Sequence, residues 1–328
     1  MARRAQGRRN TLAALSALAL LGLAPGAKAQ AFPSKPVRIV VPYAAGANSD
    51  VLTRAVAQKV TEQGGPTFVI DNKPGGGGVI GAMAARQAAA DGYTLFVANS
   101  STHGILPALQ KLPYDFQKDF QPITQLFYFS NFLIVPGRVQ AGSVQELLAL
   151  AKKSDGLTFG SQGNGSPGHL LGAMLQQQSG APLVHVPYAG GGGPMNIDVV
   201  AGRLDMVFST WASLRSHQEQ GKVRFLAVAS AQRSNVAPHI PTLAEQGLPG
   251  VALDAWFGLV APAGTPAPIV SALHAMFDRA ARAPDLAERF QAQGVTLAPN
   301  TPAAFAEQMR HEAERLGQVV RASRISAN

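Results

Sequence analysis

The sequence predicts an α/β protein made of two α/β halves, and three observations support this fold class. Strand and helix patterns alternate at lengths typical of mostly parallel, open sheets. The alternation starts again at about residue 133. A chain of 328 residues also suits about two domains of roughly 100–200 residues each. With 46% apolar and 14% charged residues, the chain can bury large cores and is not a disordered tail.

The first half reads as repeated strand–loop–helix units. The strand that ends at Val41 is stopped by Pro42, and Ser49 and Asp50 are good N-caps for the helix that follows. Apolar residues then recur at helical spacing. The expected elements are strands 37–41, 68–70 and 94–98 and helices 51–60 and 79–90.

The second half repeats this alternation and ends in helices that begin at prolines, which are favoured in the first helical turn. The expected strands are 133–135, 157–159, 183–186, 206–208 and 225–229, and the expected helices are 144–152, 167–178, 195–201, 268–281, 284–293 and 302–321.

Loops rich in Gly, Ser and Asn follow several strands, namely 43–48, 99–102 and 160–166. In open α/β sheets, ligands bind outside the carboxyl ends of the strands. Helix N-termini there offer unpaired N–H groups and partial positive charge. No Lys or Arg lies between these strand ends and the first helical turn. We therefore expect a carboxylate or phosphate held by backbone donors and hydroxyls, although ordinary turns have the same composition.

One short motif occurs in both halves. Val-Pro-Tyr-Ala-Ala-Gly at 41–46 returns as Val-Pro-Tyr-Ala-Gly-Gly at 186–191. Two similar lobes that present similar loops to one cleft would explain it, and so would chance in a chain rich in Ala, Gly and Pro.

Motifs for cofactors and catalysis are incomplete. Residues 163–168 match G-x-G-x-x-G, but 169–197 contain no acidic residue to hold a ribose hydroxyl. The glycines at 76–81 are not followed by Lys and Ser or Thr, and no G-x-S-x-G is present. The seven histidines lack metal-ligand spacing. We expect no cofactor and no metal.

Four side chains allow more than one interpretation. Asp50 is a better N-cap than a ligand group, and Asp205 suits a surface turn. His169 could hydrogen-bond at a helix start or lie near a ligand. Trp211 could form a pocket wall or belong to the core.

The N-terminus has the three parts of a signal peptide. A basic region with four arginines precedes an apolar stretch at 12–23, and Ala27-Lys28-Ala29 fits a cleavage site, as does Ala29-Gln30-Ala31. The stretch is shorter than the roughly 20 residues that cross a bilayer. Residues 1–29 hold five basic residues and no acidic one, so without them the net charge falls from +9 to +4. The remaining basic residues are scattered, which argues against nucleic-acid binding.

The chain has no cysteine, which excludes disulfides and thiolate sites and suits an oxidising compartment.

Taken in order, the motifs resemble the Bordetella uptake gene (Bug) family, the substrate-binding proteins of tripartite tricarboxylate transporters. The matching segments extend over nearly the whole mature chain and are 32–46, 72–75, 90–95, 101–103, 112–115, 159–166, 169–170, 185–188, 240–242 and 261–266.

This resemblance implies a type II periplasmic binding protein, or Venus-flytrap, with two α/β lobes joined by two crossover strands near 132–136 and 253–259. It implies a signal peptide at 1–29, one lobe from 30–131 and 254–328, and the other from 132–253. The implied partners are a small carboxylate and either transporter membrane subunits or a sensor kinase, and the protein is expected to be a periplasmic monomer.

The family holds one carboxylate by loop backbone groups, hydroxyls and ordered waters. The matching positions, with Trp211 added as a candidate wall for the rest of the ligand, are Tyr43, Ala45, Gly46, Ser101, Thr102, Ser161, Gly163, Gly165, Ser166, Tyr188 and Gly190.

The sequence departs from the family pattern where the distal part of a ligand would be recognised. Ala47 replaces a second glycine, Ala189 replaces a basic residue, the glycine run 190–193 is one residue longer, and 209–214 lack the usual Asp-Asn. We therefore expect capture of a di- or tricarboxylate, an amino acid or an aromatic acid, without catalysis. An exported enzyme acting on a small organic acid is the alternative.

Overall fold

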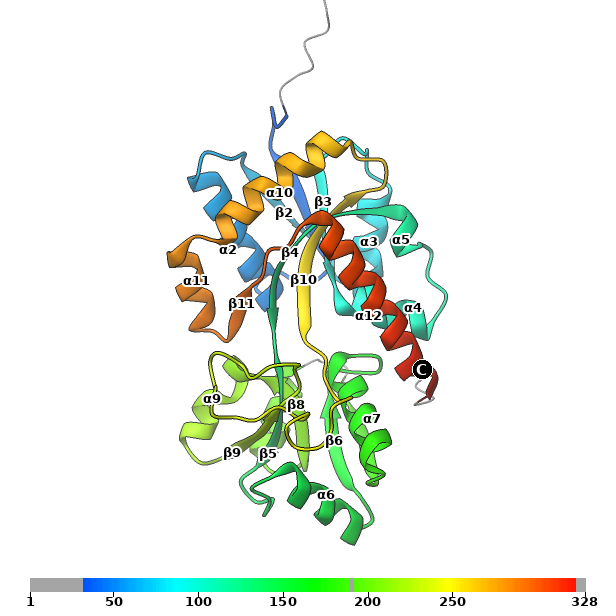
Figure 1. The fold of residues 1–328 in the computed structure, drawn as a ribbon, viewed down its shortest axis with the longest axis vertical. Helices are drawn as coiled ribbons and strands as arrows, with labels where there is room; N and C mark the ends of the chain where they lie inside the picture. The colour runs from blue at the N-terminus through cyan, green and yellow to red at the C-terminus, as the bar shows by residue number, and fades with distance from the viewer. Residues whose placement is uncertain (1–31, 189–191, 323–328) are drawn as a thin grey trace, which may run out of the picture. The chain divides into compact units, whose positions relative to one another are not determined.

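The structure is a computed structural model that describes residues 32–188 and 192–322. From Lys35 onward the chain forms one compact unit. It contains a six-stranded and a five-stranded sheet, each flanked by helices. Figure 1 shows β4 continuing into β5, which carries the chain from the first sheet to the second, and β10 leading it back. The two-lobe α/β fold expected from the sequence is therefore confirmed.

The first sheet has the strand order β11-β4-β10-β3-β1-β2. Strands β1, β2 and β3 are parallel, whereas β10 is antiparallel to β3 and β4. The strands are β1 (Val37–Val41), β2 (Phe68–Asn72), β3 (Thr94–Asn99), β4 (Phe120–Phe129), β10 (Ala255–Pro262) and β11 (Val295–Leu297).

The second sheet repeats this arrangement in the order β7-β6-β8-β5-β9. Strands β6, β7 and β8 are parallel, and β5 is antiparallel to β8 and β9. The strands are β5 (Asn131–Pro136), β6 (Leu157–Ser161), β7 (Leu183–Pro187), β8 (Met206–Thr210) and β9 (Val223–Val228).

The expectation of mostly parallel sheets is wrong, because each sheet contains a strand that arrives from the other. Strand β10 follows β9 but inserts between β3 and β4, and β5 follows β4 but inserts between β8 and β9. Both inserted strands pair antiparallel with their neighbours. The long strands β4 and β10 were not expected from the local sequence pattern.

The matched strand orders also bear on the repeated motif. By position, β1 corresponds to β6 and β2 to the edge strand β7. The first copy of the motif ends β1, but the second ends β7. The topological equivalent of the loop at 42–47 is therefore the loop at 162–166, and the motif does not mark equivalent positions.

The helices cover the strands much as expected, with differences at their ends. They are α2 (Asn48–Glu62), α3 (Val79–Arg86), α4 (Leu106–Leu109), α5 (Phe116–Asp119), α6 (Val144–Lys153), α7 (Pro167–Ser179), α8 (Gly192–Val200), α9 (Trp211–Glu219), α10 (Ala267–Ala281), α11 (Pro284–Gln291) and α12 (Pro302–Ala322), with short turns η1 (Gly76–Gly78) and η2 (Ser101–Ile105). Within the described ranges, no helix combines the length and apolar character needed to cross a bilayer.

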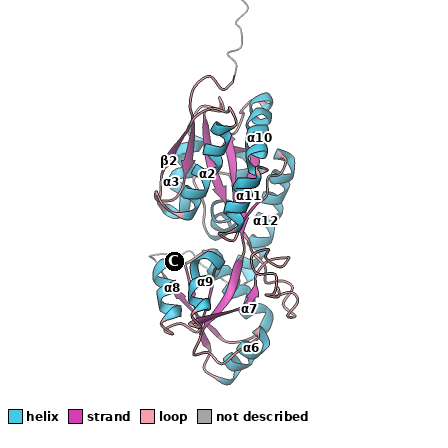
Figure 2. Ribbon diagram, turned by 90° about the vertical axis from the view of Figure 1, so that its left-hand side faces the viewer, coloured by secondary structure: helices cyan, strands magenta, loops and turns pink. Residues whose placement is uncertain are grey.

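The second sheet shows how side-chain alternation builds two cores. Leu133 and Val135 of β5 pack with α6 and α7, whereas Phe132 and Ile134 pack with α8 and α9. Successive strand residues point to opposite faces, so one apolar strand supplies both layers. Figure 2 shows α6 and α7 on one side of these strands and α8 and α9 on the other.

One local expectation needs correction, and one helix was not expected. Helix α2 begins at Asn48, with Ala47 at the N-cap, so Ser49 and Asp50 lie within its first turn and do not cap it. Residues 211–219, for which the sequence pattern predicted no element, form α9.

The chain passes between the sheets at two points. Ser130 separates β4 from β5, and Asp254 directly precedes β10. The first passage lies just before the expected crossover at 132–136, because residues 131–136 are already paired within the second sheet. The second passage lies within the expected crossover at 253–259. The division into lobes at residues 131 and 253 stays a prediction.

The two passages are tied together by hydrogen bonds. The carboxylate of Asp254 accepts from the Ser230 hydroxyl at 2.7 Å and also bonds the side chain of Ser130. The Asn131 amide donates to the carbonyl of Leu253 at 3.1 Å. These bonds connect the segment that enters the second sheet with the segment that leaves it.

A second carboxyl group lies beside this junction. Glu312 of α12 accepts a hydrogen bond from the Trp256 indole, while one oxygen of each of Glu312 and Asp254 is buried without a hydrogen-bond partner in the described structure. Burial is the main cause that raises the pKa of Glu312 to about 7, and the nearby Asp254 raises it further, against the opposing effects of Trp256 and Arg315. Burial likewise raises the pKa of Asp254.

The Glu312→Gln variant tests this carboxyl group. A folded-state pKa above the unfolded value means that protonated Glu312 stabilises the fold, and that this stability is lost as pH rises through about 7. Wild-type protein should therefore lose more melting temperature between pH 5 and pH 8 than Glu312→Gln. Glu314→Gln, an exposed control on the same helix, should keep the wild-type slope. Equal slopes for wild type and Glu312→Gln would contradict the assignment.

Candidate functional site

The loop after β1 carries three of the expected site residues. Tyr43 is half-buried, and Ala45 and Gly46 are exposed. Gly46 has φ of 83°, a left-handed conformation that favours glycine. The N-cap of α2 makes no side-chain hydrogen bond to the first turn. An exposed helix start without a side-chain cap leaves backbone donors and the positive end of the helix dipole for another acceptor.

Asp50, in the first turn of α2, holds this loop in place by hydrogen bonds. Its carboxylate accepts from the Gly46 N–H at 2.9 Å, from Arg54 at 2.9 Å and from the Asn72 amide at 3.0 Å. Burial alone would raise the pKa of Asp50, but these hydrogen bonds together lower it. Because Arg54 neutralises it, Asp50 supports the loop without leaving an unpaired negative charge under the helix start.

Tyr43 connects this loop to the end of β3. Its side chain shares a hydrogen bond with Ser101, and its ring meets Phe257 edge-on at 6.2 Å between centroids. Burial raises the pKa of Tyr43 to about 12, with a smaller opposing effect from Ser101. The phenol therefore stays protonated at neutral pH and can donate a hydrogen bond to an anion.

The turn after β3 is organised by Asn99. The Asn99 side chain accepts from the N–H groups of Ser101 and Thr102, at 2.9 Å and 3.1 Å. Thr102 is fully buried, and its hydroxyl contacts the Asn99 carbonyl and His103. Ser101 is only half-buried. Of these two expected residues, Ser101 presents a side chain near Tyr43, and Thr102 supports the turn from inside.

The loop after β6 carries four expected residues in the second sheet. The buried Ser161 hydroxyl bonds the Gly163 backbone and lies 2.7 Å from Nε2 of His185. Gly163 and Gly165 have φ of 112° and 70°. Ser166 is the N-cap of α7, and its hydroxyl accepts from the His169 N–H. Several donors of this loop are thus already used within it.

Two histidines form part of this loop's support, and one of them was not among the sequence candidates. His169 and His185 stack with ring centroids 3.7 Å apart, and Nδ1 of His169 accepts from the Gly165 N–H at 3.2 Å. Burial lowers the pKa of His169 to about 4, with a smaller contribution from His185, and burial also lowers the pKa of His185. His169 therefore makes a helix-start hydrogen bond, one of the two roles considered for it. The motif around 185 contained His185, but nothing in the sequence placed the two rings together.

Tyr188 follows β7 and turns toward α8. Its N–H donates to the Ser161 carbonyl at 3.0 Å, and its hydroxyl donates to Asp198 at 2.5 Å. Asp198 is also paired with Arg203. Gly190 lies outside the described residues. Tyr188 thus lies beside the loop after β6, with its hydroxyl engaged away from it.

Trp211 begins α9 and is half-buried. It packs against Phe225 at 5.0 Å and Phe132 at 5.9 Å between ring centroids. Its Cβ also lies close to Gly294, which follows α11. Both of the roles considered for Trp211 remain compatible with this position. Asp205 lies in the turn before β8, as expected, and its half-buried carboxylate accepts from Thr158 and pairs with Arg138.

The expected residues therefore fall into two groups, one on each sheet. Tyr43, Ala45, Gly46 and Ser101 lie together, and Ser161, Gly163, Gly165, Ser166 and Tyr188 lie together. The groups approach each other where Gly165 packs against Leu109, just beyond the turn that carries Ser101. A β-carbon at Gly165 would lie 2.4 Å from the Leu109 side chain.

This chemistry suits binding of an anion by neutral groups. The groups offered are backbone N–H groups, hydroxyls and a helix start. Among the described residues, no group of three or more His, Asp or Glu side chains is arranged to hold a metal ion.

The chain matches a family profile over most of its length. Residues 52–325 match the tripartite tricarboxylate transporter family receptor. A protein encoded in the tcbD–tcbE intergenic region of Pseudomonas sp. strain P51 is 33% identical over 98% of this chain and 96% of its own length. Protein BugT of Bordetella pertussis is 31% identical over 93% of this chain and 94% of its own length.

The chain is also similar to proteins whose structures have been solved. A protein of R. palustris solved with adipate is 30% identical, with a TM-score of 0.79 over 90% of this chain and 99% of its own. MatC of Rhodopseudomonas palustris, solved with bound malate, is 31% identical, with a TM-score of 0.74 over 88% of this chain and 100% of its own.

Replacing Asp50 with alanine tests the support beneath the first group. The change removes a buried acceptor from the Gly46 N–H, Arg54 and Asn72. Hydrogen bonds to charged groups contribute about 1.5–3 kcal/mol each, so we expect the variant to lose at least about 2 kcal/mol of unfolding free energy in urea denaturation. Asp71→Ala, which removes a more exposed carboxylate in the neighbouring strand, should cost less than about 1 kcal/mol. Equal losses for the two variants would contradict this role.

Proposed function

We propose that this chain, which belongs to the tripartite tricarboxylate transporter receptor family and is similar to the periplasmic binding protein BugD, captures a small carboxylate outside the cytoplasm. Similar proteins solved with adipate and malate support a carboxylate as the ligand. The candidate ligands are dicarboxylates, tricarboxylates, amino acids and aromatic acids.

One observation carries the proposal, namely the uncapped start of α2 beside two hydroxyl groups. Helix α2 has 15 residues and no side-chain cap at Ala47. Tyr43 and Ser101 lie hydrogen-bonded to each other next to its loop. A carboxylate placed there would accept hydrogen bonds from the first-turn N–H groups and these hydroxyls, and it would interact favourably with the helix dipole.

The loop after β6 would then contact the same ligand from the second sheet. Gly163 and Gly165 have φ values at which any other side chain would be strained. Because glycine has no side chain, a ligand can approach the backbone closely at both positions. Ser161, Ser166 and the stacked histidines fix the loop, so its shape is largely set before a ligand binds. Tyr188, Gly190 and Trp211 remain candidates for recognising the distal part of the ligand.

The N-terminal pattern supports export. A basic region, an apolar stretch and a cleavage site near Ala29 are the features of a secretory signal peptide. The mature protein would act as a monomer that delivers the acid to membrane subunits of a transporter or presents it to a sensor kinase.

The alternative of an exported enzyme finds less support in the geometry. The acid and base candidates from the sequence are Asp50, His103 and His169. Asp50 is engaged by Arg54 and Asn72, His103 is buried behind the turn, and His169 bonds the Gly165 N–H. The structure adds one hydroxyl–imidazole pair, Ser161 with His185 at 2.7 Å, but the Ser161 hydroxyl is fully buried and also contacts the Gly163 carbonyl, so it does not offer an exposed nucleophile.

Purified protein should be stabilised by one or more small carboxylates in a thermal-shift screen. A ligand at 100 times its dissociation constant adds about 2.7 kcal/mol to the unfolding free energy. For the best acid found, Ser101→Ala should weaken affinity by about tenfold or more, because it removes a hydroxyl donor to a charged group. Ser154→Ala, which alters the end of α6, is the control and should bind normally. Stabilisation by no acid, combined with turnover of one, would overturn the proposal.

Trp211 provides a test of what the site recognises beyond the carboxylate. If its ring lines the distal part, Trp211→Ala should weaken binding of aromatic acids by about tenfold while affecting malate-sized acids little, and Trp211→Phe should keep most of the affinity. Dissociation constants from calorimetry decide this. Unchanged affinities for every bound acid in Trp211→Ala would assign the ring to the core.

A further inference from the structure

Helix α12 packs into the cores of both lobes. Phe305 and Met309, in its first half, are buried with Trp256 of β10 in the core of the first lobe. Leu316 and Val320, in its second half, are buried in the core that β5, β6 and α7 form in the second lobe. In addition to the two passages of the chain between the sheets, α12 is therefore a further connection between the lobes (Figure 1).

The middle of α12 lies beside the junction where the chain passes between the sheets. Glu312 accepts a hydrogen bond from the Trp256 indole, and the Arg315 guanidinium donates to the Ala252 carbonyl at 2.7 Å. Glu312 is also close enough to Asp254 for the two carboxyl groups to influence each other. A group on the bridging helix is thus next to the carboxyl group whose hydrogen bonds tie the two passages together.

These two carboxyl groups lie in a poorly hydrated place. Asp254 and Glu312 line a cavity of about 370 Å³, yet one oxygen of each is buried and lacks a hydrogen-bond partner among the residues that the structure describes. Burial raises the pKa of both groups, and Asp254 raises that of Glu312 further, to about 7. Since like charges at close range repel strongly when little water separates them, the junction suits a protonated Glu312 and not an ionised one.

The other titratable groups that line this cavity in the described structure are Arg315 and His311. Arg315 lowers the pKa of both carboxyl groups, but it is exposed and already donates to the Ala252 carbonyl. His311 is exposed and pairs with Glu307. Neither side chain therefore cancels the repulsion between the two carboxylates.

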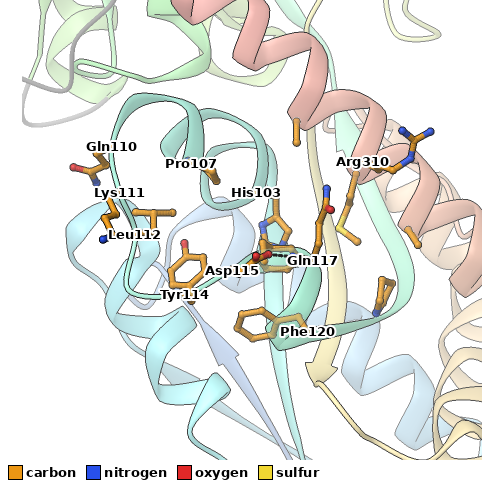
Figure 3. A pocket seen from close by; sticks show the side chains of 15 residues that line it. His103, Pro107, Gln110, Lys111, Leu112, Tyr114, Asp115, Gln117, Phe120 and Arg310 are labelled. Atoms are coloured by element: carbon orange, nitrogen blue, oxygen red, sulfur yellow. Dashed lines mark hydrogen bonds between the residues drawn. The ribbon is translucent and has the colours of Figure 1, made fainter.

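The first half of α12 has free space beside it. A cavity of about 520 Å³ separates it from the turn η2 and α4, and Figure 3 shows Pro107 and Tyr114 on one side of this cavity and Arg310 of α12 on the other. Close-packed elements resist displacement, whereas a helix next to a cavity can shift without compressing the side chains around it.

We infer that Glu312 and Asp254 form a pH-sensitive switch at the junction, which sets the arrangement of the two lobes. With Glu312 protonated, α12 and the second passage stay packed together as described. Loss of its proton places two negative charges side by side, and this repulsion is relieved when α12 and the passage move apart, which turns one lobe relative to the other. The switch requires no ligand, so it stands apart from the proposed function.

The absence of cysteine from the chain allows a direct test. Ser271 of α10 in the first lobe and Ser216 of α9 in the second are exposed, so Ser271→Cys and Ser216→Cys together provide two positions for nitroxide labels. Pulsed electron paramagnetic resonance then gives the distribution of distances between the lobes. Between pH 5.5 and pH 8.5 we expect this distribution to shift, with a midpoint near pH 7. An unchanged distribution over this range would overturn the inference.

Variants in the labelled protein assign the shift to a residue. Glu312→Gln has no proton to lose at this position, so it should keep the low-pH distribution throughout the range. His311→Gln and Glu314→Gln remove neighbouring exposed groups of α12 and should shift like the parent protein. A shift that persists in Glu312→Gln, or that disappears in His311→Gln, would assign the titration to another group and contradict the switch.

Discussion

The parallel pairing of β1 with β3 is the constraint on which the candidate site depends. Parallel strands end at the same edge of a sheet, so the loop after β1 and the turn after β3 lie side by side. The hydrogen bond between Tyr43 and Ser101 follows from this register. In the second sheet, the parallel pairs of β6 with β7 and β8 place Ser161 and Tyr188 together in the same way. Each sheet thus offers loops at one edge, and the matched strand orders make the loops at 42–47 and 162–166 equivalent.

Electrostatics distinguish the two loops. Beneath the first, Asp50 and Arg54 neutralise each other, and the start of α2 keeps its own partial charge. In the second, Ser166 caps α7, and two neutral histidines hold the backbone. Under the proposed function, a carboxylate would bind at the start of α2, and the loop after β6 would contribute shape. Neutral groups would then hold the acid without a salt bridge.

Local sequence patterns predicted most strands and helices because their apolar spacing is strong in β1, β3, α6 and α12. They did not predict β4 and β10, whose partners are far away in the sequence and whose identity as strands depends on the crossing of the chain. They predicted Ser49 and Asp50 as N-caps, whereas the Asp50 carboxylate accepts hydrogen bonds from Arg54 and Asn72 within the first turn of the helix. The resemblance to a family supplied the two lobes and the candidate residues, but not the burial of Thr102 or the stacking of His169 on His185, since both depend on tertiary packing.

A crystal structure of the protein with a bound dicarboxylate would show directly whether the start of α2 holds the ligand. We predict that one carboxylate lies within hydrogen-bond distance of the first-turn N–H groups of α2 and of the hydroxyls of Tyr43 or Ser101, with no Lys or Arg in contact. A carboxylate bound through a salt bridge to a basic side chain, or placed away from the start of α2, would contradict it.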